Sequence, residues 1–560
     1  MEQMRLLLAI VLSFLVFVVW QWLVVEPEMV KQAQQPAPVA ETQTQPEEDT
    51  SPPPAEAVAP ETPAPTVTGE DLNPAPTPSD RESRTITVET PLYTVTFTEK
   101  GAALDDLILK KYRESVGADA ALKDMVQEKA QGLNLTAGWV GPHLDGMENA
   151  LYALSGKEDT LVVRDQERSI EFQWVNSDGI RVRKQFVFTP DSYLIDLNLT
   201  VENRSAGELS GQPVVQIAHV VQDPESRITF EGAMAFVDNT LEEIKVKDIA
   251  ENPALTGTFR WVGVTDRYFM NVLIPEEPIG ATLRMETVGE DLVISEFVRP
   301  ETTLAAGESE VFNYKALIGP KETEMLAAAN YELGEAVNFG MFDFLAKPFL
   351  WIMNQIYKVV PNYGVAIIVL TLLTKIILWP LGNKSYKSMN DMKRMQPLMT
   401  EIREKHKNDK KKMNEETMAL YRTYKINPMG GCLPMIVQLP VFLALYRMLY
   451  QAIELRHAPF FGWINDLSAP DRLFDFGFSI PLMQPPYGIP VLTVVMGATM
   501  FLQQKMSPPP GDPTQAKMMM FMPIIFTVIF INFPAGLVLY WLINNIFSIG
   551  QQYYIQKKYA

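Results

Sequence analysis

A single charged side chain inside a long apolar stretch is the feature of this sequence with the clearest chemical consequence. Lys375 lies within the apolar block Gly364–Leu381. A charge inside hydrocarbon costs several kcal/mol unless it meets water or a partner, so the residue is a candidate for function. The plainer alternative is snorkelling, because Lys375 is six residues, or about 9 Å of helix, from the end of the block.

Polar residues in other apolar blocks predict a water-filled pocket around this lysine, open to the cytoplasm. Its expected lining is Gln438, Gln503, Asn544 and Asn545. Hydrogen bonds between helices would explain each of these residues equally well when taken singly. No acidic residue stands in the other apolar blocks, which argues against an ion pair. We also expect no serine close enough to form a Ser–Lys hydrolase site.

Enzyme and metal signatures are absent from the sequence. The chain of 560 residues has one cysteine, Cys432, and four scattered histidines: His143, His219, His406 and His457. An internal disulfide is therefore excluded and a zinc site is disfavoured. Because no HExxH, GxSxG, Walker A or GxGxxG pattern occurs, we predict that the protein is not an enzyme and needs no cofactor or metal.

The last 220 or so residues carry the apolar blocks that would position the lysine. Several have roughly 14–16 apolar residues where a full crossing needs about 20, so either the bilayer thins there or our boundaries err. Residues 532–536 predict a tight turn between the last two blocks. Before the blocks, residues 321–345 predict an amphipathic helix along the outer membrane interface. The blocks are Gly364–Leu381, Gly431–Tyr450, Ile489–Leu502, Met518–Phe533 and Ala535–Ile549.

Charge orients these blocks in a membrane. The loop 384–427 has twelve basic and six acidic residues, whereas the loop 451–487 has a net charge of −2. Lys505 and Lys517 flank another loop, and Lys557 and Lys558 stand at the end. The positive-inside rule then places loops 384–427 and 505–517 and the C-terminus in the cytoplasm.

The basic loop 384–427 predicts a helical hairpin. Met389, Met392, Met395, Met399 and Ile402 recur at helical spacing, and a second stripe follows residues 407–410: Thr417, Leu420, Tyr421 and Tyr424. We therefore expect two amphipathic helices, the first perturbed by Pro397. The outer face could meet ribosomal RNA or anionic lipid, although a plain solvated face is the simpler interpretation.

The N-terminal region predicts an anchor and a tether. Residues 6–25 are largely apolar and long enough to span a bilayer, and Trp20 and Trp22 replace the small residues of a cleavage site. With this uncleaved anchor, residues 1–25, the chain has six expected spans and both ends in the cytoplasm. Residues 26–84 are rich in Pro, Ala, Gln, Thr and Glu, which predicts a disordered linker.

Residues 85–320 alternate with a period of two and predict a β-sandwich on the periplasmic side. Tyr93, Val95 and Phe97 share one face of a strand, and residues 176–179 predict a hairpin turn. Lys184 interrupts the apolar face formed by Ile180, Val182, Phe186 and Phe188. A structural or docking module is the preferred interpretation, and a cleft for peptides or sugars the alternative. The predicted fold class is thus a membrane protein of α+β type, with a helical membrane core at residues 321–560.

Several motifs resemble those of a known family. The stretch Ala419–Tyr446, which contains Asn427-Pro428-Met429-Gly430-Gly431 and Gln438-Leu439-Pro440, is similar to the signature of the YidC/Oxa/Alb insertase family. The segments 466–468, 504–507 and 533–541 are also similar to it. The resemblance covers the whole chain in layout, as in the Gram-negative form with a large periplasmic domain. It implies a membrane protein insertase and chaperone without covalent chemistry.

The resemblance also implies roles for individual residues. Lys375 matches a cationic position in a hydrophilic groove where family members usually have arginine; lysine keeps the charge but lacks the planar fork. Gln438 matches a polar groove residue, and we add Gln503 and Asn544 to that groove. A hydrophobic slide, along which client helices leave for lipid, is implied at Pro440, Phe442, Leu537 and Tyr540.

The implied partners are nascent membrane proteins, membrane lipids and the Sec translocon of the bacterial inner membrane. The ribosome and the signal recognition particle receptor are further candidates, and no DNA is expected. The tail after the last block is short, which weakens the expectation of ribosome docking. A transporter with Lys375 as its anion site and a membrane enzyme are the alternative classes. We find neither inverted repeats nor a nucleophile–base pair to support them.

Overall fold

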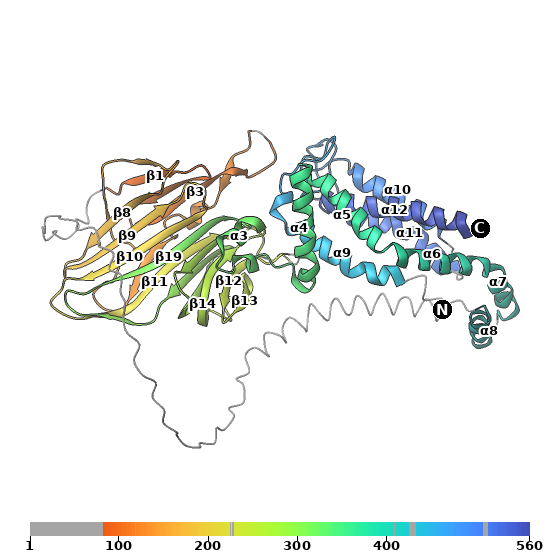
Figure 1. The fold of residues 1–560 in the computed structure, drawn as a ribbon, viewed down its shortest axis with the longest axis horizontal. Helices are drawn as coiled ribbons and strands as arrows, with labels where there is room; N and C mark the ends of the chain where they lie inside the picture. The colour runs from red at the N-terminus through yellow and green to blue at the C-terminus, as the bar shows by residue number, and fades with distance from the viewer. Residues whose placement is uncertain are drawn as a thin grey trace, which may run out of the picture. The chain divides into compact units, whose positions relative to one another are not determined.

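The computed structural model describes residues 82–559 except residues 118, 225, 227–228, 408, 425–432 and 508–512. The predicted anchor and nearly all of the predicted linker lie outside the described residues, as does Cys432. Apart from residues 513–515, all described residues belong to one compact unit, residues 74–511 and 516–560. Within it, a β-rich part precedes a helical part along the chain (Figure 1).

The β-rich part occupies the range predicted for the β-domain, from Thr85 to Pro320. Its strands are β1 Thr85–Glu89, β2 Tyr93–Thr98, β3 Ala103–Arg113, β4 Leu122–Asp124, β5 Thr136–Val140, β6 Ala153–Leu154, β7 Thr160–Val162, β8 Arg168–Val175, β9 Ile180–Phe188, β10 Leu194–Asn203, β11 Leu209–Val220, β12 Gly232–Val237, β13 Thr240–Lys245, β14 Ala254–Thr265, β15 Phe269–Pro275, β16 Ile279–Val288, β17 Leu292–Val298, β18 Thr302–Leu304 and β19 Ser309–Pro320.

These strands form two sheets that pack face to face. A five-stranded sheet has the order β4-β3-β2-β1-β7, and a fourteen-stranded sheet has the main path β18-β11-β17-β16-β14-β15-β19-β10-β9-β8-β6. Phe97 of β2 meets Phe186 of β9 across the interface with ring centroids 4.4 Å apart. Alternate residues of β9 and β10 are buried, so the predicted period of two is confirmed for these strands.

The predicted hairpin turn at residues 176–179 is also confirmed. Strands β8 and β9 pair antiparallel on either side of it. The Asn176 side chain accepts hydrogen bonds from the backbone N–H groups of Asp178 and Ile180 at 3.0 and 2.8 Å. Such a short polar side chain replaces the backbone partners that a tight turn leaves unpaired.

The amphipathic helix predicted over residues 321–345 is wrong. That segment holds three short pieces: helix α3 Thr323–Ala329 and 3-10 turns at Leu333–Ala336 and Gly340–Phe342. Asn330, Tyr331 and Glu332 have positive φ angles, which ends the helix. Leu326 and Leu333 pack on the sheet in one cluster with Trp261, so the apolar stripe serves the β-rich part.

An amphipathic helix does follow, one segment later than predicted. Helix α4 spans Asp343–Val359 and buries Ala346, Leu350 and Met353 against the other helices. Its opposite face leaves Phe344 70% and Trp351 63% exposed. Large aromatic side chains exposed on one helix face are typical of a helix that lies at a membrane surface.

The five predicted apolar blocks coincide with helices of the structure. Among the described residues, no single helix has the length and hydropathy for a full membrane crossing. Helices α5 and α6 together have the length and hydropathy for a crossing, as a pair bent by 65°. The longest helix, α12, runs ten residues beyond its predicted end. The helices are α5 Tyr363–Ile377, α6 Trp379–Arg394, α9 Leu433–Gln451, α10 Val491–Met506, α11 Pro513–Phe530 and α12 Ala535–Tyr559.

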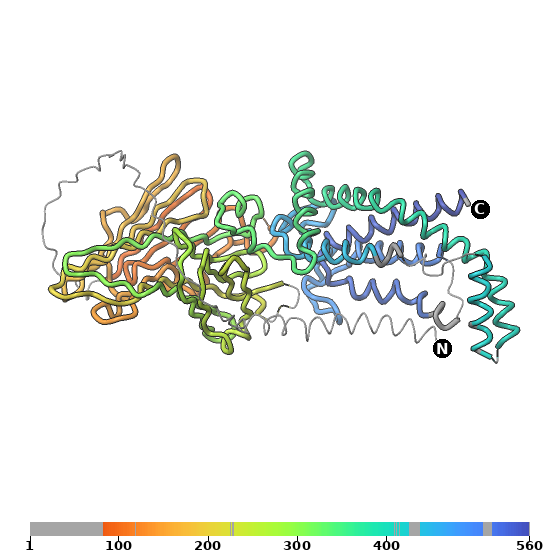
Figure 2. The backbone as a smooth tube through the Cα atoms, turned by 60° about the horizontal axis from the view of Figure 1, so that its bottom comes forward, coloured from red at the N-terminus to blue at the C-terminus, as the bar shows by residue number. Residues whose placement is uncertain are grey.

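The predicted hairpin is present in the basic segment, and its first arm is divided. Helix α6 ends at Arg394, and α7 Gln396–Lys405 begins with Pro397 in its first turn. Proline is favoured there because the first helical N–H groups have no partner. Helix α8 Lys410–Thr423 returns beside α7 (Figure 2), and the Tyr421 hydroxyl meets the Met399 sulfur at 3.5 Å.

Candidate polar groove around Lys375

Lys375 is placed by the end of a helix. The Asn362 side chain accepts a hydrogen bond from the Val365 N–H at 3.0 Å and caps the start of α5. The helix ends at Ile377, after which Pro380 enters the first turn of α6. A proline restricts the residue before it and disfavours continuation of a helix across it. Lys375 therefore lies in the last turn of α5, half-buried, at a 65° bend.

The Lys375 ammonium donates a hydrogen bond to the Ser548 hydroxyl on α12, with 2.8 Å between Nζ and Oγ. Ser548 is 2% exposed and donates its own proton to the Asn544 carbonyl at 2.7 Å. Our expectation that no serine lies near Lys375 is therefore wrong.

This pair is nevertheless a poor hydrolase dyad. The Ser548 proton is engaged by a carbonyl, and the lysine acts as a donor where a nucleophilic serine would need a base. In this arrangement the buried Ser548 hydroxyl stabilises the ammonium charge and is not available as a nucleophile.

Gln438 and Asn544 extend the same network. The Gln438 amide donates to the Asn544 side-chain oxygen at 2.6 Å. The Gln438 side chain also lies within interaction range of the Tyr540 hydroxyl. Helices α9 and α12 are thus joined by polar groups one turn away from Ser548.

Gln503 joins through a residue that the sequence did not single out. The Tyr386 hydroxyl on α6 lies within interaction range of the Ser548 and Gln503 side chains. Hydrogen bonds join Lys375, Asn544 and Gln438 through Ser548, and Gln503 lies beside this network across Tyr386. Asn545 faces α10 instead, donating to the Thr499 hydroxyl at 3.3 Å.

The sequence carried a signal for the missed serine. Polar residues recur every three or four positions along α12, and this spacing places them on one helix face. Their partners beyond the network include the Trp379 carbonyl, Asn383, Ser507 and the Met506 carbonyl. The stripe consists of Asn544, Ser548, Gln551, Gln552 and Gln556.

Among the described residues no ion pair with Lys375 is found, and its hydrogen-bond partner is the neutral Ser548 hydroxyl. No cluster of three His, Cys, Asp or Glu side chains that could hold a metal ion occurs in that part of the chain either. The network thus presents one cation surrounded by neutral donors and acceptors.

The four predicted slide residues are not equally accessible. Pro440 and Phe442 are half-buried on α9. Leu537 and Tyr540 are only 1% and 3% exposed, so they support the helix packing from inside. Phe442 packs edge-on against Trp541 with ring centroids 4.7 Å apart. Their role in passing a client to lipid stays a prediction.

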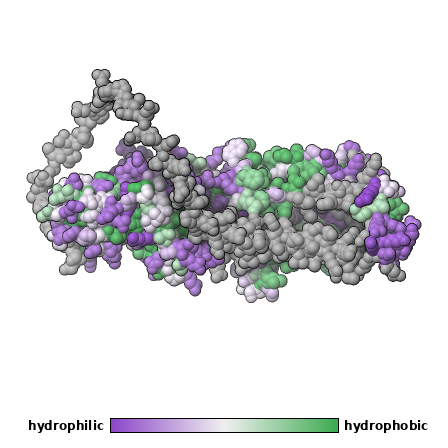
Figure 3. Space-filling model, turned by 90° about the horizontal axis from the view of Figure 1, so that it is seen from below, coloured by the Kyte–Doolittle hydropathy of each residue, from purple (hydrophilic) through white to green (hydrophobic). Residues whose placement is uncertain are grey.

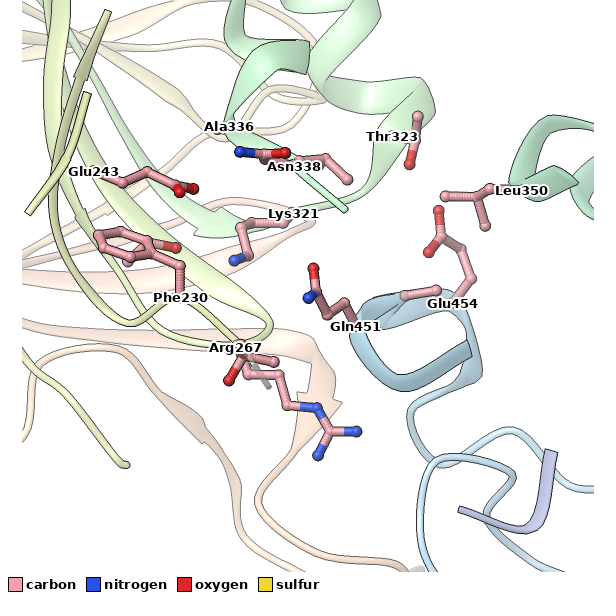
Figure 4. A pocket seen from close by; sticks show the side chains of 14 residues that line it. Phe230, Glu243, Arg267, Lys321, Thr323, Ala336, Asn338, Leu350, Gln451 and Glu454 are labelled. Atoms are coloured by element: carbon pink, nitrogen blue, oxygen red, sulfur yellow. The ribbon is translucent and has the colours of Figure 1, made fainter. Parts of the chain in front are cut away.

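A polar cavity lies near the end of α9, away from the Lys375 network. Figure 4 shows Lys321 reaching into it from the end of β19, with Glu243 and Gln451 nearby. Burial lowers the pKa of Lys321, while Asp266 and other carboxylates oppose that shift. The Lys321 ammonium donates to the Asp266 carbonyl at 2.6 Å. An ammonium held by a backbone carbonyl, with carboxylates nearby, favours a structural role.

Comparison with known proteins decides the family. The model of the YidC periplasmic domain matches residues 85–352, and that of the 60Kd inner membrane protein matches residues 355–560. A membrane protein insertase YidC of Syntrophus aciditrophicus (strain SB) is 40% identical over 99% of both chains. The chain belongs to the YidC family of membrane protein insertases.

Other relatives agree with this assignment. The YidC of Pelobacter propionicus is 39% identical over 99% of both chains. A crystal structure of an active YidC insertase covers 85% of this chain with 18% identity and a TM-score of 0.37, values that add nothing to the assignment. All members of the Lys375 network lie within the matched range 355–560 of the YidC-family chain.

Proposed function

We propose that this chain inserts membrane proteins through a groove centred on Lys375. A client's hydrophilic end would be held near the ammonium, partway into the membrane, while its apolar segment moves into lipid. Transfer of that segment out of water supplies the driving force, so no nucleotide is needed for the step. The protein acts as an insertase and chaperone without covalent chemistry.

The observation that carries this proposal is the Lys375 network itself. One cation, half-buried and held by a neutral hydroxyl, has no carboxylate partner among the described residues. A buried cation without a counter-ion attracts an acidic client tail more strongly than an exposed one, because little water screens it. The polar stripe on α12 supports a path to the cytoplasm, since it continues to Gln556 beside Lys557 and Lys558.

Apolar surface near the network supports the exit of clients into lipid. In Figure 3 hydrophobic side chains gather on the helical part of the chain, and hydrophilic ones cover the hairpin of α7 and α8. Such large apolar surfaces mark contact with lipid or with other chains. The exposed apolar residues of α10 and α11 include Val494, Val495, Phe501, Leu502, Ile524, Ile525, Val528 and Ile529.

The topology belongs to the same proposal. Six spans with both ends in the cytoplasm would put the β-rich part in the periplasm and α7 and α8 in the cytoplasm. The charge difference between the two large loops supports that orientation. A β-rich part with its own core fits a domain outside the bilayer.

The proposed partners are nascent membrane proteins and inner-membrane lipids. The Sec translocon is a further partner, and the ribosome and the signal recognition particle receptor are candidates that the basic hairpin could meet. The hairpin carries its charge on exposed side chains such as Lys405, Lys407 and Arg422. Electrostatic contacts of this type weaken with salt.

Reconstitution tests the groove. Proteoliposomes containing only this protein would receive a short, acidic-tailed membrane protein, and insertion would be read by protease protection. We expect the Lys375→Arg protein to insert the client as well as the unaltered chain does. In the Lys375→Ala protein, insertion should fall about tenfold, the effect of losing one strong charge interaction. Lys384→Ala, which removes an exposed lysine of α6, is the matched control. Equal insertion by Lys375→Ala and the unaltered chain would contradict the proposal.

A further inference from the structure

We infer that Ser548 and Tyr386 are positioning residues that hold the Lys375 ammonium inside the groove. This inference rests on the proposed function of Lys375 and adds the residues that make its charge usable. Neither residue is expected to touch the client. They act through the lysine, by fixing where its charge is.

The hydroxyl of Ser548 is oriented to accept a hydrogen bond. Its single proton is directed to the Asn544 carbonyl at 2.7 Å, which leaves an oxygen lone pair for the ammonium at 2.8 Å. A serine without that carbonyl partner could turn its proton toward the cation. The hydrogen bond to the Asn544 carbonyl, one turn back on α12, directs the proton away from the cation.

Tyr386 reinforces the arrangement from a different helix. Its hydroxyl lies within interaction range of Ser548 and of Gln503 on α10. Four helices, α5, α6, α10 and α12, therefore contribute to the surroundings of one ammonium. Hydrogen bonds linked in this way stabilise one another in surroundings of low polarity.

Positioning matters because a lysine stem is flexible and the cytoplasmic interface is close. Lys375 is in the last turn of α5, so without a partner its ammonium can turn toward water at the helix end. The hydrogen bond to buried Ser548 holds it on the α12 side instead. An ammonium has three donors, so two stay available to a client carboxylate.

The experiment compares two clients that differ only in the tail, one acidic and one with the acids replaced by their amides. Insertion into proteoliposomes is measured for both, and the ratio of acidic to neutral client is the readout. A loss of packing would lower insertion of both clients and leave the ratio unchanged. Insertion of the neutral client therefore reports that each variant is folded.

We expect Ser548→Ala to lower the ratio by roughly tenfold, toward the value of Lys375→Ala, because a hydrogen bond to a charged group is lost. Ser548→Thr keeps the hydroxyl and should keep the ratio. Tyr386→Phe should lower it by a smaller factor. Thr371→Val, which removes a buried hydroxyl that bonds the Ile367 carbonyl within α5 itself, is the matched control and should leave it unchanged.

An unchanged ratio in Ser548→Ala, with a lowered ratio in Lys375→Ala, overturns this inference and leaves the groove proposal standing. An unchanged ratio in Lys375→Ala overturns both. A lowered ratio in Thr371→Val would also overturn the inference, because any lost hydroxyl near α5 would then have the same effect.

Discussion

At the scale of single residues, two lysines in apolar surroundings have contrasting environments. Lys375 bonds a neutral hydroxyl next to a stripe of polar side chains. Lys184 is completely buried in the β-rich part, where it donates to the Gly101 carbonyl and lies 5.2 Å from the centre of the Tyr152 ring. The first is the proposed client site, whereas the second lies inside the core of the β-rich part.

Lys184 makes the stability of the β-rich part depend on pH. Burial lowers the pKa of its ammonium from 10.5 to about 7, and Glu148 opposes the shift only in part. Between these two values the unfolded chain binds a proton that the folded chain does not, so stability rises with pH, by at most about 1.4 kcal/mol per unit. We expect Lys184→Met to remove this slope and to raise the melting temperature at pH 7.

Thermal unfolding of the full chain at pH 7 and pH 9 checks this prediction. Lys111→Met, which replaces an exposed lysine of β3, should keep the slope. If the Lys184→Met protein melts at a lower temperature and its stability still rises with pH, the prediction is wrong, and Lys184 keeps its charge in the folded protein.

At the residue level, a polar side chain in an apolar block is visible from composition alone, so the sequence pointed to Lys375, Gln438, Gln503 and Asn544. Their role in a groove stays a prediction. Ser548 was missed because one serine near a helix end is common, and its partner is 173 residues away. Lys184 looked like an interruption of an apolar face, although burial continues through it along β9.

At the scale of elements, a close approach between α10 and α11 depends on a glycine. A Cβ atom on Gly497 would lie 2.1 Å from the Thr527 hydroxyl oxygen, which donates to the Pro523 carbonyl. Gly497→Ala should therefore push the two helices apart or break that hydrogen bond, at a cost of about 1–3 kcal/mol. Thermal unfolding in detergent measures this cost.

A double-mutant cycle provides the control. Thr527→Ala removes the obstructing hydroxyl, so the Gly497→Ala/Thr527→Ala protein should recover most of the lost stability. Strictly additive effects of the two substitutions would contradict the proposed contact.

The elements themselves were predicted unevenly. The apolar blocks matched helices because a long apolar segment has few other stable conformations. The helix expected over residues 321–345 failed because three left-handed residues interrupt it and its apolar stripe packs on a sheet. That sheet is formed by distant strands, which local periodicity does not reveal.

At the scale of the whole molecule, an arginine links the β-rich part to the end of α9. The Arg267 guanidinium donates to the Tyr450 carbonyl at 2.8 Å and stacks on the Tyr450 ring at 3.7 Å. We expect Arg267→Ala to raise hydrogen exchange of the backbone at residues 451–455 about tenfold, since that end of α9 loses its anchor.

Arg260→Ala is the matched control, because Arg260 of β14 pairs at 3.0 Å with Glu332, just before the 3-10 turn Leu333–Ala336, and not with α9. It should leave exchange at residues 451–455 unchanged. Equal exchange in the unaltered chain and in Arg267→Ala would show that the arginine does not hold this end of the helix.

A charge exchange tests the central claim most directly. Lys375→Glu would be reconstituted without a membrane potential and given matched clients with acidic and basic tails. If the groove attracts clients by charge, the variant should insert the basic-tailed client better than the acidic one, reversing the preference of the unaltered chain. Insertion that falls equally for both clients, or an unchanged preference for the acidic tail, would contradict the account.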